Sequence, residues 1–242
     1  MSTRSLLSTA TKDRDTQKFK VVVLGDESSG KTSIIRRAVE NKFSKEYEAT
    51  LGVDLFTKTV CTPGRKYVRL QVWDTSGQER FKASIPSYIR DCHIAIIAFD
   101  VTSREQYGSI EKWVNEVSEL REQDEVWVFI VATKCDKPLS QRCFTRQEID
   151  AKLHTLQRKE APNNNIVSPI LFYMTIYTNP SESSLPPHIK ISNSACCIFV
   201  LSLFTIPVLK LQYIETSGKA GFNIRRMFYE ITTKLIDQTS QQ

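Results

Sequence analysis

The amino-acid sequence predicts an α/β fold, with a mostly parallel six-stranded sheet, one antiparallel edge strand and helices on both faces. Short apolar runs, typical of buried parallel strands, recur along the chain. Segments with apolar residues at helical spacing lie between these runs. Strands that alternate with helices of this length are typical of a doubly wound sheet, in which ligands bind at the carboxyl ends of the strands.

The first strand is expected at residues 19–24, which read FKVVVL and end at a glycine. A helix follows, with apolar Ile34, Ile35 and Ala38 on one face. Residues 55–61 and 67–73 alternate in polarity on either side of a Pro-Gly pair. Such a pattern predicts a hairpin at one edge of the sheet.

Two further apolar runs, residues 94–99 and 126–132, are expected to be parallel strands covered on both faces. A helix is predicted between them from the spacing of Ile110, Trp113, Val114, Val117 and Leu120. A last strand should precede Glu215. The last amphipathic helix is predicted from Ile224, Met227, Phe228, Ile231 and Leu235.

Composition excludes several classes of protein. Hydrophobic residues make up 40% of the 242 and charged residues 25%, as in a soluble globular protein. The net charge of +6 is scattered, so no basic surface for nucleic acid is predicted. The six cysteines match neither a disulfide scaffold nor a zinc pattern, which indicates reduced thiols and a cytoplasmic protein.

The chain divides into three parts in this interpretation. Residues 1–18 are polar and form an expected disordered arm without a secretory signal. Residues 19–236 form one domain, interrupted by an atypical proline-containing insertion at about 161–211. Residues 237–242 form a short tail without cysteine.

A glycine-rich loop between the first strand and the first helix predicts a phosphate-binding site. It matches the pattern G-x-x-x-x-G-K-S/T at Gly25, Asp26, Glu27, Ser28, Ser29, Gly30, Lys31 and Thr32, and Ser33 follows. The backbone N–H groups of such a loop close around phosphate oxygens, and the helix N-terminus adds its dipole. Lys31 would reach the β- and γ-phosphates, and Thr32 would offer its hydroxyl to Mg²⁺.

A second motif, Asp74-Thr75-Ser76-Gly77-Gln78, ends the third predicted strand. Asp74 could hold the Mg²⁺ shell, the N–H of Gly77 could meet the γ-phosphate, and Gln78 could orient the attacking water. The spacing of about forty residues after the glycine-rich loop strengthens this interpretation.

Two later loops indicate a guanine base. They are Thr133-Lys134-Cys135-Asp136 and Glu215-Thr216-Ser217-Gly218-Lys219. The carboxylate of Asp136 can accept from both N1–H and the exocyclic amine of guanine, whereas the Watson–Crick edge of adenine would leave it mispaired. This distinction favours GTP over ATP and argues against a P-loop ATPase.

With four motifs in this order, the sequence resembles the Ras superfamily of small GTPases, and within it the Rab family. Residues 80–91, RFKASIPSYIRD, are most similar to the Golgi-trafficking branch. The resemblance covers residues 19 to about 159 and 212 to about 236, and it implies the P-loop NTPase fold called a G domain.

The resemblance also implies roles for individual residues. Thr50 would be the switch threonine, which binds Mg²⁺ with Thr32 and Asp74 and senses the γ-phosphate. Catalysis would depend on Gln78, Lys31 and Thr50. Around the base, Phe43 would pack against guanine, Lys134 would cover it, and Ser217, Gly218 and Lys219 would form the loop that offers N–H groups to its oxygen.

A role in vesicle-mediated protein transport follows from the same resemblance. A monomeric switch would bind effectors in its GTP form, and an exchange factor and a GTPase-activating protein would control it. Intrinsic hydrolysis should be slow without an arginine from a partner. Rab proteins reach Golgi or vesicle membranes through prenylated cysteines, and the tail has none, so the sequence does not support membrane anchoring.

The chain departs from the family at several positions. Thr133 stands where most members carry asparagine, so we expect a lost brace and weakened nucleotide binding. Glu27 lies where the loop approaches the γ-phosphate, so its carboxylate should slow or alter hydrolysis. A non-hydrolysing GTP- or GDP-binding interaction module is therefore the alternative function. Ser76 replaces the usual alanine, and Leu55 replaces a phenylalanine of the effector surface.

The insertion leaves three interpretations open. The first is a membrane span formed by its apolar part, residues 195–209, which includes Cys196 and Cys197 but is short for this role. A single crossing would also place Ser217 and Lys31 on opposite sides of a bilayer. A membrane-surface or partner-binding lobe is the second interpretation. The third is a poorly ordered segment, or the product of a faulty gene model such as a translated intron.

Overall fold

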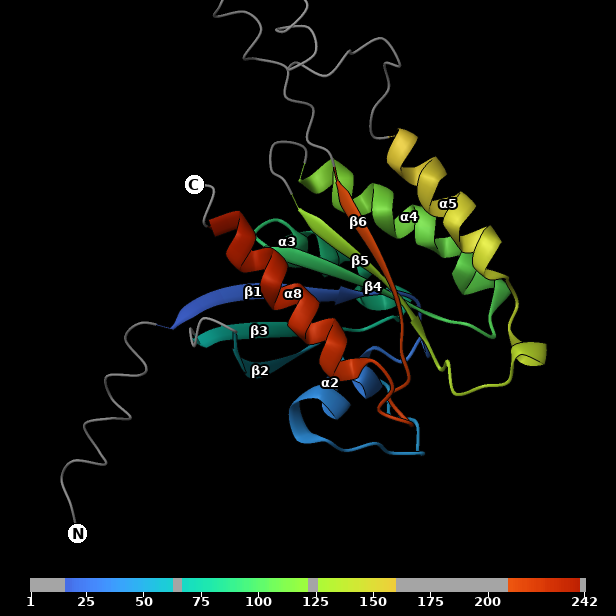
Figure 1. The fold of residues 1–242 in the computed structure, drawn as a ribbon, viewed down its shortest axis with the longest axis horizontal. Coiled ribbons are helices and arrows are strands. Elements are labelled where there is room, and N and C mark those ends of the chain that lie inside the picture. The colour runs from blue at the N-terminus through green and yellow to red at the C-terminus, as the bar shows by residue number, and fades with distance from the viewer. Residues whose placement is uncertain (1–15, 63–66, 122–125, 160–208, 240–242) are drawn as a thin grey trace, which may run out of the picture.

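A six-stranded sheet is the centre of the protein (Figure 1). The computed structural model describes residues 16–62, 67–121, 126–159 and 209–239. The strand order is β2-β3-β1-β4-β5-β6. The strands are β1 (Gln17–Leu24), β2 (Val53–Cys61), β3 (Tyr67–Thr75), β4 (Ile94–Asp100), β5 (Trp127–Thr133) and β6 (Lys210–Glu215). Only β2 pairs antiparallel, with β3, so the predicted sheet is confirmed.

Helices cover both faces of this sheet, as predicted (Figure 1). One face carries α2 (Lys31–Glu40) and α8 (Ile224–Thr239). The opposite face carries α3 (Ile85–Ile89), α4 (Arg104–Leu120) and α5 (Arg146–Lys159). Two short 3₁₀ helices, η1 (Glu79–Ser84) and η2 (Leu139–Gln141), lie in the connections after β3 and β5.

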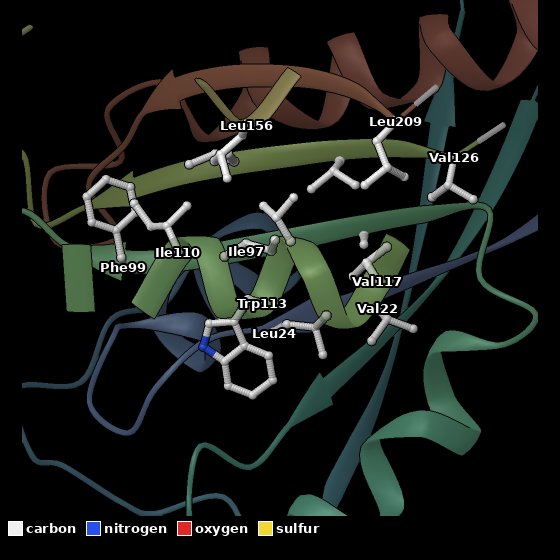
Figure 2. Close-up of a cluster of buried hydrophobic side chains, with 14 of the residues drawn as sticks. Val22, Leu24, Ile97, Phe99, Ile110, Trp113, Val117, Val126, Leu156 and Leu209 are labelled. Carbon is white, nitrogen blue, oxygen red and sulfur yellow. The ribbon is translucent and has the colours of Figure 1, made fainter. Parts of the chain in front are cut away.

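The two faces enclose two separate clusters of buried apolar side chains. Along β1, Val21 and Val23 point to the α2 and α8 side, whereas Val22 and Leu24 point to the α4 side. Figure 2 shows the second cluster, in which Trp113 of α4 lies close to Leu24. Each such side chain contributes about 1.5–3 kcal/mol when it is removed from water. This burial on both faces fixes the strand ends that carry the loops of the site.

The observed elements extend beyond the predicted ones. The pairs Val53↔Thr75 and Asp54↔Asp74 continue the β2–β3 ladder, because backbone pairing does not require the alternating side chains that predicted this hairpin. β1 begins at Gln17, so residues 17 and 18, which were expected to belong to the N-terminal arm, are part of the first strand. α8 continues to Thr239, so half of the expected tail at 237–242 is helical.

Several expectations lie outside the described residues. They concern the arm over 1–15, the Pro63-Gly64 turn, the insertion over 161–208 with Cys196 and Cys197, and the last residues, 240–242. The described cysteines, Cys61, Cys92, Cys135 and Cys143, are free thiols. Among the described helices, none combines the length and the apolar character needed to cross a bilayer.

Candidate functional site

A pocket of about 480 Å³ lies at the carboxyl ends of the parallel strands. The loops after β1, β3, β5 and β6 contribute to its wall, and so does the segment between α2 and β2 that contains Phe43 and Thr50. Lys and Arg side chains outnumber Asp and Glu side chains along this wall. The pocket therefore suits an anionic ligand and brings together residues from all four sequence motifs.

The loop after β1 needs its two glycines for different reasons. Gly25 has a φ of 135°, and a Cβ atom at this position would lie 2.1 Å from the carbonyl oxygen of Ala98. Gly30, the residue before α2, has a φ of 88° and adopts the left-handed conformation that is easiest for glycine. Together these positions turn the backbone around one end of the pocket.

Lys31 is almost completely buried beneath this loop. Its Nζ donates to the carbonyl oxygens of Gly25 and Asp26, both at 2.8 Å. Burial lowers the pKa of Lys31 to about 8, because the ammonium loses its hydration. A polyanion beside Lys31 would favour the charged form again, so this lysine is suited to bind phosphate.

Three oxygen-bearing side chains meet next to Lys31. The hydroxyl of Thr32 donates to Oδ2 of Asp74 at 2.6 Å, and it lies 2.9 Å from the hydroxyl of Thr50. Asp74 is fully buried, and its Oδ1 has no hydrogen-bond partner. Burial raises the pKa of Asp74 to about 6.

These three residues fit a magnesium ion. Mg²⁺ prefers hard oxygen donors and is usually held by one or two carboxylates, with waters and phosphate oxygens completing its shell. The unpaired Oδ1 of Asp74 is an orphaned acceptor that a cation would satisfy. Within the described residues, no cluster of three His, Cys, Asp or Glu side chains suits a metal, so this mixed donor set is the candidate.

The glycine after β3 allows the second motif to approach the first. A Cβ atom at Gly77 would lie 2.4 Å from the backbone N of Glu27. Any other residue would therefore push the two loops apart. Ser76 at this turn accepts from the backbone N–H of Gln78 at 3.2 Å and supports the same conformation.

Glu27 connects the glycine-rich loop to both neighbouring segments. Its Oε1 accepts from the hydroxyl of Tyr47 at 2.9 Å and from Nε2 of Gln78 at 3.3 Å. These hydrogen bonds, that of Tyr47 first, lower the pKa of Glu27. The other end of the Gln78 amide accepts from Nε of Arg80 at 2.9 Å. Both ends of Gln78 are thus engaged by protein side chains.

The two loops predicted to recognise the base lie together at the other end of the pocket. Ser217 donates its hydroxyl to Oδ1 of Asp136 at 2.6 Å, and the backbone N–H of Cys135 donates to the carbonyl of Thr216 at 3.0 Å. Arg37 of α2 donates to the carbonyl oxygens of Gly218 at 2.7 Å and Lys219 at 2.8 Å. The loop that follows β6 is therefore held from both sides.

Lys134 lies beside the same pocket and pairs with an acid at the end of β4. Its Nζ lies 2.6 Å from Oδ2 of Asp100. Burial alone would raise the pKa of Asp100, but hydrogen bonds from Lys134 and Thr102 outweigh burial and lower it. Asp100 thus fixes the lysine whose stem is expected to cover the base.

Thr133 corrects one expectation. Its hydroxyl donates to the carbonyl oxygen of Ser29 at 2.6 Å and has the carbonyl oxygen of Phe99 within reach at 3.1 Å. The threonine therefore keeps a brace between β5 and the glycine-rich loop, and the expected loss of that brace was wrong. The short threonine side chain reaches the loop because it lies directly against Gly30, where a Cβ atom would be 3.3 Å from the Thr133 hydroxyl.

Sequence patterns missed several residues that shape the pocket. Asp100 is the last residue of the buried strand β4, a position where site residues are common in such sheets, and this could have identified it. Tyr47 and Arg37 gave no comparable indication, because their contacts join residues far apart in the chain. The side chain of Asp26 points away from the pocket, to Trp113 of α4.

The comparison with protein families agrees with this geometry. The model of the Ras family matches residues 20–160 of the chain. This stretch contains the glycine-rich loop, the Asp74–Gln78 turn and the Thr133–Asp136 loop.

Proposed function

The chain belongs to the Ras family of small GTPases, and from that premise we propose that it is a GTP/GDP-regulated switch that binds and hydrolyses GTP with Mg²⁺ in the pocket described above. The convergence of four separate motifs on one pocket carries this proposal. Thr32, Thr50 and Asp136 line that pocket; Thr32 donates to Asp74 behind it, and Asp136 accepts from Ser217.

The phosphate end would bind the charged part of the nucleotide. The backbone N–H groups of residues 25–30 and the N-terminus of α2 would surround the phosphate oxygens. Lys31 would neutralise the β- and γ-phosphates, and Thr32, Thr50 and Asp74 would hold Mg²⁺. When bound, the metal neutralises charge that develops on the phosphates. Thr50 and Gly77 would sense the γ-phosphate, so the segments around them would differ between the GTP and GDP forms.

The guanine end would select the base. Asp136 would accept from the two donors on the guanine edge, while its other contact, the Ser217 hydroxyl, holds the carboxylate in place. The N–H groups of Gly218 and Lys219 would face the guanine oxygen. The N–H of Ser217, expected to do the same, instead donates to the carbonyl oxygen of Phe222 at 3.1 Å and closes the loop. Phe43 and the stem of Lys134 would cover the ring.

Hydrolysis would require Gln78 to leave its present partners. Gln78 can orient an attacking water only if its amide is free, and here Glu27 and Arg80 occupy both ends. We expect a slow intrinsic rate that a GTPase-activating protein increases by supplying charge and by repositioning Gln78.

A Rab-like role in vesicle-mediated transport at the Golgi is the finer proposal. Exposed Leu55 of β2 lies opposite Trp73 of β3, which forms a ring pair with Tyr88 at 5.5 Å between centroids. Tyr47 and Leu51, also exposed, belong to the segment just before β2. This apolar surface adjoins both segments that would sense the γ-phosphate, so effectors could read the GTP form there.

Nucleotide binding tests the proposal directly. Protein stripped of nucleotide would be titrated with labelled GDP, GTP and ATP in magnesium buffer. We expect saturable binding of both guanine nucleotides and at least a hundredfold weaker binding of ATP. An Asp136→Ala variant should lose this preference. Equal binding of ATP and GTP, or no saturable uptake of any nucleotide, would contradict the proposal.

The bond between Glu27 and Gln78 favours a second candidate, a GTP-binding interaction module that does not hydrolyse GTP. Single-turnover hydrolysis separates the two candidates. A switch should show a slow but measurable rate, and Glu27→Gln should increase it by about tenfold if the carboxylate restrains Gln78. Glu119→Gln, at an exposed position of α4, serves as the matched control. Equal rates in Glu27→Gln and wild type would remove the restraining role of Glu27.

A further inference from the structure

We propose that Trp113 of α4 is a positioning residue for the glycine-rich loop. Its indole N–H holds the carboxylate of Asp26, the second residue of the loop, on the side away from the pocket. The part of this inference that concerns nucleotide release rests on the proposed function. The part that concerns the conformation of the loop does not.

The contact between Trp113 and Asp26 is short and partly buried. Trp113 Nε1 lies 2.9 Å from Asp26 Oδ1, and the Trp113 side chain is only 5% exposed within the apolar cluster below α4. A buried indole N–H usually has a hydrogen-bond partner. Here that partner belongs to the loop that would bind phosphate, and Figure 2 shows Trp113 beside Leu24, two residues before Asp26.

A second residue of α4 holds the next position of the loop. Gln106 lies seven residues before Trp113, two turns along the same helix face, and its Nε2 donates to the carbonyl oxygen of Glu27 at 3.0 Å. Its Oε1 accepts from the backbone N–H of Asp100 at 2.9 Å, so the Gln106 amide is fixed at both ends. Helix α4 therefore contacts two consecutive residues of the loop from outside the pocket.

The direction of the Asp26 side chain matters because the backbone carbonyl of the same residue faces the pocket side of the loop. That carbonyl accepts from Lys31 Nζ at 2.8 Å, on the pocket side of the loop. Trp113 thus anchors the same residue whose backbone orients the buried lysine. Without the indole donor, the Asp26 carboxylate could turn toward the pocket, where its charge would oppose an anionic ligand and the loop backbone would move with it.

The first readout is hydrogen exchange of residues 25–32 in nucleotide-free protein. It would be compared among wild type, Trp113→Phe, Asp26→Ala, the double variant, and Trp127→Phe as the control. Trp127 is a tryptophan of β5 with lysines over its ring, remote from the loop. We expect faster exchange in this segment for both single variants and the double variant, and wild-type exchange for Trp127→Phe.

The second readout is the rate at which a fluorescent GDP analogue dissociates. Trp113→Phe and Asp26→Ala should each increase this rate about tenfold, equivalent to ~1.4 kcal/mol, and the double variant should show about the same increase because both remove one bond. Asp26→Asn keeps an oxygen acceptor and should show a smaller increase than Asp26→Ala. A purely structural role would lower the melting temperature without this non-additivity.

The outcomes separate this inference from the proposed function. If wild type does not bind the analogue, the proposed function fails, and the exchange data still decide the role of Trp113. If wild type binds but Trp113→Phe matches Trp127→Phe in both readouts, the inference is overturned. Rate increases that multiply in the double variant would overturn it as well. If Trp113→Phe does not fold, the comparison of Asp26→Ala with Asp26→Asn decides. Equal hydrogen exchange and equal rates of GDP dissociation in these two variants would overturn the inference.

Discussion

Replacing Asp74 by asparagine should stabilise the protein when it is free of nucleotide and magnesium. Asp74 is fully buried, and its Oδ1 has no hydrogen-bond partner. The charged carboxylate is therefore kept in an environment that favours the neutral form. An asparagine retains an oxygen acceptor for Thr32 and removes the buried charge.

The size of the effect follows from the pKa of Asp74. Burial raises this pKa from 3.8 to about 6, and one pKa unit corresponds to ~1.4 kcal/mol. Ionised Asp74 thus costs up to ~3 kcal/mol of stability at pH 7. This figure already includes the attraction between Asp74 and Lys31, which holds the pKa of Asp74 lower than burial alone would. We expect a net gain of ~1–3 kcal/mol, or an increase of roughly 2–4 °C in melting temperature for each kcal/mol.

Denaturant unfolding in EDTA would measure this gain, with Asp100→Asn as the matched control. Both aspartates lie in neighbouring regions of the sheet and are buried, but the pKa of Asp100 is lowered by its bonds to Lys134 and Thr102. Asp100→Asn should therefore destabilise the protein under the conditions in which Asp74→Asn stabilises it. With magnesium and GDP present, Asp74→Asn should lose the stabilisation that the ligands give to wild type.

The pH dependence of the free energy of unfolding shows whether ionised Asp74 stabilises or destabilises the fold. Between pH 3.8 and about 6 the folded state binds more protons at Asp74 than the unfolded state does, so this residue lowers stability as pH rises through that range. The stability difference between Asp74→Asn and wild type should accordingly be small near pH 4 and grow toward pH 7. A difference that is negative at pH 7, or constant across the range, would refute this reasoning about the buried carboxylate.

Three further predictions concern the same pocket. Thr133→Val should lose ~1–3 kcal/mol of stability, because it leaves the buried Ser29 carbonyl without its donor. Thermal melting measures this loss, and the control Thr133→Ser, which keeps the hydroxyl, should stay near wild type. Asp136→Asn should weaken GDP binding about a hundredfold in a competition titration, since an amide offers a donor where guanine needs an acceptor; unchanged affinity would contradict the assignment of the base. Magnesium affinity, measured calorimetrically in the GDP complex, should fall by up to tenfold per pH unit below about pH 6 as Asp74 is protonated, and an affinity independent of pH would exclude Asp74 as a ligand.

Much of the fold could be predicted because the relevant patterns are local. The apolar runs at 94–99 and 126–132 correspond to β4 and β5, and the glycine-rich loop lies between β1 and α2 as its pattern requires. The ends of elements were less predictable, since the β2–β3 ladder continues through polar Asp54 and Thr75.

The contacts that shape the pocket could not be predicted in the same way. The hydroxyl of Thr133 meets Ser29 across 104 residues of sequence, and Trp113 meets Asp26 across 87 residues. Such pairs depend on how the loops at the strand ends approach each other. A tryptophan at helical spacing predicts burial of its ring but does not predict the partner of its N–H.

The order of the pocket residues along the chain has a consequence for synthesis. The wall draws on residues from Glu27 to Lys219, and β6 joins the sheet only through β5, with Lys210 opposite Trp127. A ribosome adds roughly 5–20 residues per second, N-terminal segments first. The phosphate end can therefore form on a nascent chain well before the guanine end exists. Stabilisation by nucleotide would reach this protein only after residues 210–219 have been synthesised, and the earlier segments must remain soluble without it.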